Sequence, residues 1–358
     1  MKLKHVYIEN FKGLSKLDLD LVGNDGQARR LTALRGGNGS GKTSVLQAIA
    51  LTLSLATRRT KEPQDLDWHG FLAERLGTRG ETRVEVRVEF TDDELEAIQA
   101  VYQVWADTRT PDYSTIRPGR HREVTLVYER GRPYALEGAD ALFQFRGRSY
   151  IKTMLQRMPS LRAHFSRVGD VFWFDQHRNL GSRIENDGDG ARARATWTAG
   201  VEQLRERLIG WWAYHTSAYR EPSRDYIAGI QEAYGKLFPG TSFRGVQPRS
   251  PIADDPASDF LFLFERNGLT YDLMELSSGE QAVFPILSEC VRLGMHRSVV
   301  LIDELELHLH PPQQQALLNA LRHLAPESQF IITTHSPYLE DVIPDDWTCR
   351  LEGGRVWS

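Results

Sequence analysis

Cysteine is scarce in this chain of 358 residues, where only Cys290 and Cys349 occur. Two cysteines are too few for a disulfide framework, and this pair is not spaced as metal ligands are. We therefore expect two buried thiols in a protein of a reducing, cytoplasmic compartment.

Long hydrophobic runs are missing as well. No stretch approaches the roughly 20 apolar residues of a membrane span, and the first residues, MKLKHVYIENF, alternate like a strand instead of forming the apolar core of a signal peptide. Neither sustained heptads nor a repeat of about 20 to 50 residues is present. These absences argue against a membrane protein, a long coiled coil and a solenoid.

Charge of neither sign dominates, since the net charge is −4, but the charges are unevenly distributed. Residues 117–207 carry 17 basic and 11 acidic side chains, whereas residues 208–358 carry 11 and 20. A basic region can contact nucleic acid phosphates, although a solvated surface role is equally plausible for each arginine. The candidate phosphate contacts are Arg117, Arg120, Arg122, Arg146 and Arg148.

A glycine-rich turn lies between the predicted strand Leu31–Leu34 and the predicted helix Ser44–Ala56. Its residues, GGNGSGKT, fit the pattern G-x-x-x-x-G-K-[ST], in which backbone N–H groups surround phosphates. Lys42 would reach the β and γ oxygens and the Thr43 hydroxyl would bind Mg²⁺. The pattern predicts ATP and Mg²⁺ as cofactors. The candidate nucleotide-binding residues are Gly36, Asn38, Gly39, Ser40, Gly41, Lys42, Thr43 and Ser44.

Two carboxylates follow a second predicted core strand, Val299–Ile302. Ligands bind at the carboxyl ends of such strands, so we expect Asp303 to hold Mg²⁺ and Glu304 to polarise the attacking water. Further along, the apolar run Phe330–Thr334 leads to His335, which we predict to sense the γ-phosphate. Lone histidines are more often structural, but this one follows the other motifs in order.

The segment LSSGEQ, Leu276–Gln281, precedes a predicted helix over Ala282–Leu293. A Ser-Ser-Gly turn at a helix start can bind an anion, although an ordinary helix N-cap with Glu and Gln in the first turn gives the same pattern. Pro285 lies inside this helix, where proline removes a hydrogen bond and favours a kink.

In their order along the chain, the glycine-rich turn, Leu276–Gln281, the strand with Asp303 and Glu304, and His335 resemble the Walker A, signature, Walker B and H-loop motifs of ABC-type ATPases. IENFKG at Ile8–Gly13 and DELELHLHP at Asp303–Pro311 make the chain similar to the RecF, SMC and OLD-like branch, the AAA-family ATPases of DNA repair and phage defence. This resemblance implies two heads packed head to tail, with the signature of one contacting ATP on the other. It adds as candidates Lys12, Ser278, Gly279 and Glu280 for the nucleotide and Gln176 for Mg²⁺. It also places His308 and His310 toward the partner rather than in a metal site.

The resemblance implies an α/β P-loop NTPase of ABC type with a mixed central sheet and an N-terminal antiparallel β subdomain, expected at Leu3–Ile8 and Leu17–Leu21. An inserted α/β lobe and a helical arm complete the expected fold. The expected domains are an ATPase core at residues 1–60 and 255–358, the lobe at 61–170, and the Q-loop strand with the arm at 171–254.

In this branch, ATP closes a dimer and hydrolysis reopens it. We therefore expect an ATP-hydrolysing homodimeric switch in phage defence or DNA repair, open to larger assembly and to DNA binding. Only 23 residues follow His335, so we expect a nuclease or toxin effector on a separate chain. Two alternatives are the nucleotide-binding subunit of a membrane transporter, disfavoured by the DELELHLHP segment, and a non-hydrolysing scaffold, disfavoured by Glu304 and His335.

Overall fold

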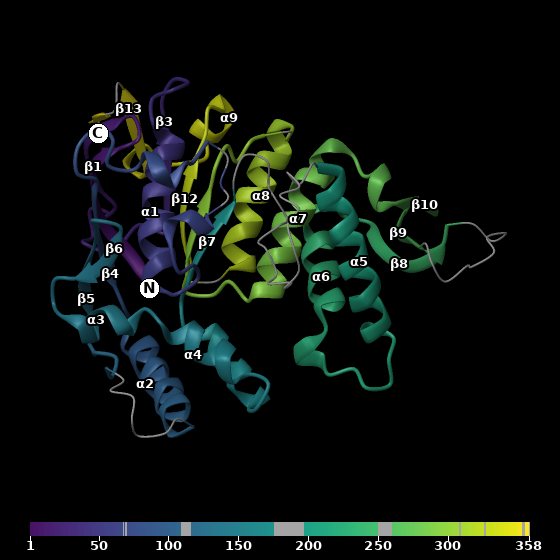
Figure 1. Ribbon diagram of the computed structural model, residues 1–358. Coiled ribbons are helices and arrows are strands. Elements are labelled where there is room, and N and C mark those ends of the chain that lie inside the picture. Colours follow the sequence, from purple (N-terminus) through teal and green to yellow (C-terminus); the bar gives the residue numbers. More distant parts are fainter. Residues whose placement is uncertain are drawn as a thin grey trace. The chain divides into compact units, whose positions relative to one another are not determined.

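The computed structural model comprises two compact units (Figure 1). Unit 1 comprises residues 1–175, 294–305 and 325–358, and unit 2 comprises residues 176–293 and 306–324. These limits do not coincide with the domain boundaries expected at residues 60, 170 and 254. The described residues are 1–66, 68, 70–108, 116–174, 197–249, 260–307, 309–325, 327–352 and 355–357.

Unit 1 contains an antiparallel sheet in the order β2-β1-β4-β5-β6. Its strands are β1 Lys2–Phe11, β2 Leu14–Asp20, β4 Arg83–Glu89, β5 Glu123–Glu129 and β6 Arg132–Ala135. Along β4, the buried Val84, Val86 and Val88 alternate with charged residues, because successive side chains of a strand point to opposite faces. Strands β4 to β6, expected in a separate lobe, thus continue the N-terminal sheet.

A second sheet of unit 1 has the order β14-β13-β3-β12-β11-β7. Neighbours from β13 to β7 are parallel and β14 is antiparallel, so this sheet is mixed, as expected. Its inner strands are short apolar runs buried on both faces. The strands are β3 Leu31–Arg35, β7 Val171–Phe174, β11 Val299–Ile302, β12 Gln329–Thr333, β13 Thr348–Glu352 and β14 Arg355–Trp357.

Helix α1, Lys42–Ala56, contacts strands of both sheets in unit 1. A helix that is apolar on all sides is a core helix, and Leu46, Leu51 and Leu53 are all fully buried. Two further helices pack against each other, α2 Asp92–Asp107 and α4 Gly147–Met154. The short helices are α3 Ala139–Gln144 and α9 Pro337–Glu340.

Unit 2 combines helices with a small antiparallel sheet in the order β10-β9-β8. An aromatic cluster of Tyr234, Phe243, Phe262, Phe264 and Phe284 fills its core. The elements are α5 Trp197–His215, α6 Tyr226–Leu237, β8 Thr241–Pro248, β9 Phe260–Arg266, β10 Leu269–Asp272, α7 Ser278–Leu293 and α8 Pro311–Leu324. In the described part of the expected helical arm lie the helices α5 and α6, followed by strand β8.

Helix α7 continues across Pro285, whose carbonyl oxygen accepts a hydrogen bond from the Ser288 hydroxyl at 2.9 Å.

Both cysteines are buried and free, as expected, and burial raises the pKa of the Cys290 thiol to about 12. None of the helices among the described residues has the length and apolar character needed to cross a membrane.

Candidate functional site

The glycine-rich loop connects β3 to α1 and can be built only with glycine at two positions. A Cβ atom on Gly36 would lie 2.2 Å from the carbonyl oxygen of Leu351, and one on Gly41 would lie 2.6 Å from Cδ2 of Leu14. Gly41 also has a φ of 100°, a conformation that other residues rarely adopt. The loop backbone is therefore held by close packing within unit 1.

Lys42 is the first residue of α1, and its ammonium group turns back over the loop. Its Nζ donates to the carbonyl oxygens of Gly36 at 2.9 Å and Gly37 at 3.1 Å. The first N–H groups of a helix have no partner within the helix and attract anions. The candidates Asn38, Gly39 and Ser40 lie in the same loop, and Ser44 lies in the first turn of α1.

Asp303 directly follows β11, and its hydrogen bonds connect the glycine-rich loop to the neighbouring strand β12. One of its carboxylate oxygens accepts a hydrogen bond from the Thr43 hydroxyl at 2.8 Å, and the other accepts one from the Thr333 hydroxyl at 2.6 Å. The carboxylate is almost fully enclosed, with 1% of the residue exposed. Hydroxyl and carboxylate oxygens are ligands that Mg²⁺ prefers, so Thr43 and Asp303 fit this ion.

Glu304 lies beside Asp303 in an unusual backbone conformation, with a φ of 47°. Its N–H donates to the Thr333 hydroxyl oxygen at 2.7 Å. Thr333 thus contacts both carboxylate residues, a role that the sequence reasoning missed. The available signal was a threonine at the end of an otherwise apolar buried strand.

Lys12 lies in the tight turn between β1 and β2 with a φ of 54°. Its Nζ donates to the Gln47 side-chain oxygen at 2.7 Å. Burial lowers the pKa of Lys12, while the negative charge of Asp303 acts in the opposite direction. The hydrogen bond to Gln47 holds Lys12 against α1, the helix that begins at the glycine-rich loop.

His335 follows β12 and is exposed. Because β3, β12 and β11 are parallel neighbours, their carboxyl ends place the loop, His335 and Asp303 at one edge of the sheet. Gln176 and His308 lie outside the described residues, and His310 is exposed. In the described ranges, no group of three or more His, Cys, Asp or Glu side chains is arranged to hold a metal ion.

The signature segment lies in unit 2, where Ser278 and Gly279 begin α7. Glu280 is only 3% exposed, and its carboxylate accepts hydrogen bonds from the hydroxyls of Tyr234 and Ser277, both at 2.7 Å, and from Arg266 at 2.5 Å. The Ser277 N–H donates to the same carboxylate at 3.0 Å. Glu280 therefore anchors the turn from inside unit 2.

Arg148 was a candidate for a phosphate contact, with a solvated surface role as the alternative, and both predictions are wrong. Only 4% of the residue is exposed, and it donates to the carbonyl oxygens of Val168, Phe165 and Gly294. It supports backbone turns in unit 1. Among the other candidates, Arg117 donates to Gln99, Arg122 pairs with Asp92, Arg120 is exposed, and Arg146 is half-buried.

Comparisons with known proteins agree with this architecture. A family model described as "AAA domain, putative AbiEii toxin, Type IV TA system" matches residues 128–341, and another, described as "AAA domain", matches residues 5–137. The chain is 21% identical to the Retron Ec83 probable ATPase of Escherichia coli, with 100% of this chain and 73% of that protein covered. It is 24% identical to the OLD nuclease of Thermus scotoductus, with coverage of 95% and 60%.

Among solved structures, the SMC head domain from Thermotoga maritima is 16% identical, with 99% of this chain and 97% of that chain covered and a TM-score of 0.49. The expected resemblance to ATPases of the RecF, SMC and OLD-like branch is confirmed by the family models and the relatives. Since the first family model spans more than half of the residues, the chain belongs to the AAA-domain family described as "AAA domain, putative AbiEii toxin, Type IV TA system".

Proposed function

We propose that this protein binds and hydrolyses ATP with Mg²⁺ and that it uses the cycle as a dimerisation switch. The observation that carries the proposal is the Asp303 carboxylate, held between the hydroxyls of Thr43 and Thr333 at 2.8 and 2.6 Å. These contacts join the end of the glycine-rich loop to the end of β11. Such an arrangement suits a nucleotide whose phosphates and metal ion lie at the carboxyl ends of these parallel strands.

The residues at the carboxyl ends of β3, β11 and β12 each have a distinct role in the proposed reaction. The loop N–H groups and Lys42 bind the phosphate oxygens, while Thr43 and Asp303 would hold Mg²⁺. When bound, the ion neutralises charge on the β- and γ-phosphates. Glu304 would accept a proton from the attacking water. His335 and Lys12 would contact the γ-phosphate, and Gln176 would assist at the metal.

The signature would complete the site from a second copy of the chain. In a head-to-tail dimer, Ser278 and Gly279 would present the start of α7 to ATP bound by the partner, since a helix N-terminus attracts phosphate. Glu280 would hold this turn rather than touch the nucleotide, because its carboxylate oxygens accept hydrogen bonds inside unit 2.

The biological role we infer is phage defence. The relatives include proteins named as retron ATPases, a Septu protein and an OLD nuclease. We propose that ATP-driven closure of the dimer controls a separate effector protein, such as a nuclease or toxin. DNA repair is the related role that the same machinery would serve.

The first test is the rate of ATP turnover by the wild type, by Lys42→Ala and by Lys236→Ala. Lys236 is an exposed lysine of unit 2 that pairs with Glu232, so it serves as the matched control. We expect Lys42→Ala to lose about 100-fold or more, because it removes a charge that stabilises the transition state, and Lys236→Ala to match the wild type. Chelation of Mg²⁺ should abolish turnover and its return should restore it. Wild-type protein that binds ATP without turnover would instead be a non-hydrolysing scaffold.

A further inference from the structure

One acidic residue, Asp272, holds the stretch of chain that leads into the signature segment. Asp272 ends β10 and caps a 3₁₀ turn, Leu273–Glu275, which directly precedes the signature. Its carboxylate accepts hydrogen bonds from the N–H groups of Phe262 and Met274, both at 3.0 Å. The direction in which the chain enters the signature therefore depends on this carboxylate.

An arginine of α5 binds the same carboxylate. Nη2 of Arg205 donates to Asp272 at 2.7 Å, and both side chains are enclosed, with 9% and 8% of them exposed. Helix α5 also contacts the 3₁₀ turn itself. This buried ion pair thus joins α5 to the residues that enter the signature.

The sequence of α5 explains how Arg205 reaches this position. Leu204 and Leu208 are one turn apart and both are buried in the core of unit 2. Since neighbouring helix residues are about 100° apart, Arg205 and Arg207 flank this apolar stripe on opposite sides. Arg207 approaches Glu289 of α7 at 3.1 Å. Helix α5 is therefore fixed at two points, one before the signature and one in the helix that follows it.

The buried pair is a poor source of stability. The cost of removing two charges from water roughly cancels their attraction, so buried ion pairs stabilise a fold only weakly. Nε of Arg205 is also buried and has no acceptor among the described residues, which adds a further cost. Because stability does not account for this pair, the geometry that it imposes on Asp272 is its more direct consequence.

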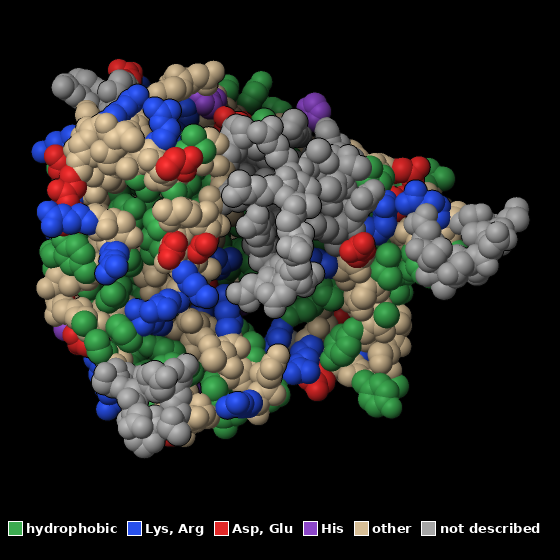
Figure 2. Space-filling model, viewed as in Figure 1, with side chains coloured by type: hydrophobic (Ala, Val, Ile, Leu, Met, Phe, Trp, Pro, Cys, Tyr) green, Lys and Arg blue, Asp and Glu red, His purple; other side chains and the backbone are tan. Residues whose placement is uncertain are grey.

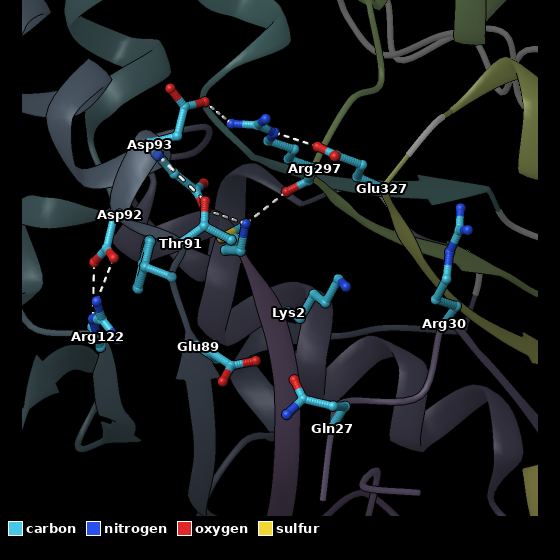
Figure 3. A pocket seen from close by; sticks show the side chains of 13 residues that line it. Lys2, Gln27, Arg30, Glu89, Thr91, Asp92, Asp93, Arg122, Arg297 and Glu327 are labelled. Carbon is cyan, nitrogen blue, oxygen red and sulfur yellow. Dashed lines mark hydrogen bonds and ion pairs between the residues drawn. The ribbon is translucent and has the colours of Figure 1, made fainter. Parts of the chain in front are cut away.

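Exposed charge pairs elsewhere in the chain differ from this buried pair. Lys, Arg, Asp and Glu side chains are spread over the face of the molecule in Figure 2. A cavity of about 530 Å³ in unit 1 collects several of them (Figure 3), where Arg297 pairs with Asp93 and Glu327, and Arg122 pairs with Asp92. Water screens such partly exposed charges, so these pairs impose little geometry on the backbone.

We propose that Arg205 is a positioning residue for ATP turnover: by holding Asp272, it sets the signature turn for contact with ATP bound by a second copy of the chain. This inference rests on the proposed head-to-tail dimer. Loss of Arg205 leaves the Asp272 carboxylate buried without its cation, so the 3₁₀ turn and the start of α7 lose their fixed position. Both residues of the pair belong to unit 2, whereas the glycine-rich loop belongs to unit 1. The variant's own ATP-binding loop therefore stays intact.

The first measurement compares ATP turnover and ATP binding of the wild type and three variants. Arg205→Met should lower kcat at least about tenfold, while ATP binding by dilute, monomeric protein stays within about twofold of wild type. Arg205→Lys keeps the charge and should retain at least about one third of the turnover. Arg220→Met is the matched control and should equal wild type, since Arg220 pairs at 2.8 Å with Asp225, a buried aspartate that caps α6.

Mixing two impaired variants tests whether the defect acts across the dimer. Lys42→Ala has a defective ATP-binding loop and an intact signature, and Arg205→Met has the reverse. In equal amounts they should restore about one quarter of wild-type turnover, because half of the dimers are mixed and each of these has one complete site. Ser278→Arg mixed with Lys42→Ala is the positive control. Asp272→Asn should behave like Arg205→Met in the mixture, and it replaces that variant if Arg205→Met does not fold.

Wild-type turnover in both Arg205→Met and Asp272→Asn would overturn the proposal. So would the absence of any gain on mixing either of them with Lys42→Ala when Ser278→Arg does give a gain, because a merely structural defect is not repaired by a partner copy. If the wild type hydrolyses ATP and none of the mixtures gains activity, the head-to-tail dimer itself is wrong and this inference falls with it.

Discussion

At the scale of single residues, Thr333 links the two carboxylates of the proposed site. Its hydroxyl donates to Asp303 and accepts from the N–H of Glu304. Glu304 needs such support, because a left-handed backbone in a residue other than glycine costs about 1 kcal/mol or more. We infer that Thr333 is a positioning residue, which sets the direction of Asp303 and the backbone of Glu304.

Replacing Thr333 by Val keeps the shape of the side chain but removes the hydroxyl. The partly buried N–H of Glu304 then loses this acceptor and the buried Asp303 carboxylate loses a donor, so we expect a loss of about 1–3 kcal/mol in unfolding free energy. We also expect kcat to fall more than ATP affinity. Steady-state kinetics and urea unfolding measure both effects. Thr333→Ser should restore most of the activity, whereas equal failure of Ser and Val would point to packing instead.

At the scale of elements, the first turn of α7 is held in place by hydrogen bonds from other residues of unit 2. Tyr234 of α6 and Arg266 of β9 both reach Glu280 in the first turn of α7. Burial acts to raise the pKa of Glu280, but the hydrogen bonds from Ser277 and Tyr234 outweigh it, and the pKa is lowered. The ionised carboxylate is therefore the form that holds the signature turn.

This lowered pKa predicts how stability depends on pH. A carboxyl group with a depressed pKa in the folded state stabilises the protein above its ordinary pKa, and the effect is lost as the pH falls below that range. Glu280→Gln should therefore lower the unfolding free energy of the protein by about 1–3 kcal/mol at pH 7. The difference in unfolding free energy between this variant and the wild type should shrink below about pH 4.5. Glu232→Gln, at an exposed position on α6, is the control. A difference that stays constant with pH would contradict the account.

The short core strands could be predicted from the sequence. Val299–Ile302 has the expected bounds, because strands buried on both faces are continuous apolar runs. The pairing of β4 with β1 was not predicted, since alternation fixes which face of a strand is buried but not its neighbour. The burial of Arg148 was missed because its partners are backbone carbonyls, which have no signature in the sequence.

At the scale of the whole molecule, the proposed machinery is distributed over the chain. Strand β3 comes from the first part of the sequence, and β11 and β12 come from the last part, yet they are neighbours in one sheet of unit 1. The signature turn belongs to unit 2. A cycle in which ATP joins the loop of one copy to the signature of another would therefore link nucleotide state to association between molecules.

The measurement that tests this account most directly is the molar mass of wild type and Glu304→Gln in solution, with and without ATP and Mg²⁺. The proposal predicts that Glu304→Gln binds ATP, turns it over at least about 100-fold more slowly, and accumulates as a dimer only when ATP is present. Ser278→Arg in the same background should remain monomeric while still binding ATP. If Glu304→Gln binds ATP and its mass does not change, the head-to-tail switch is wrong.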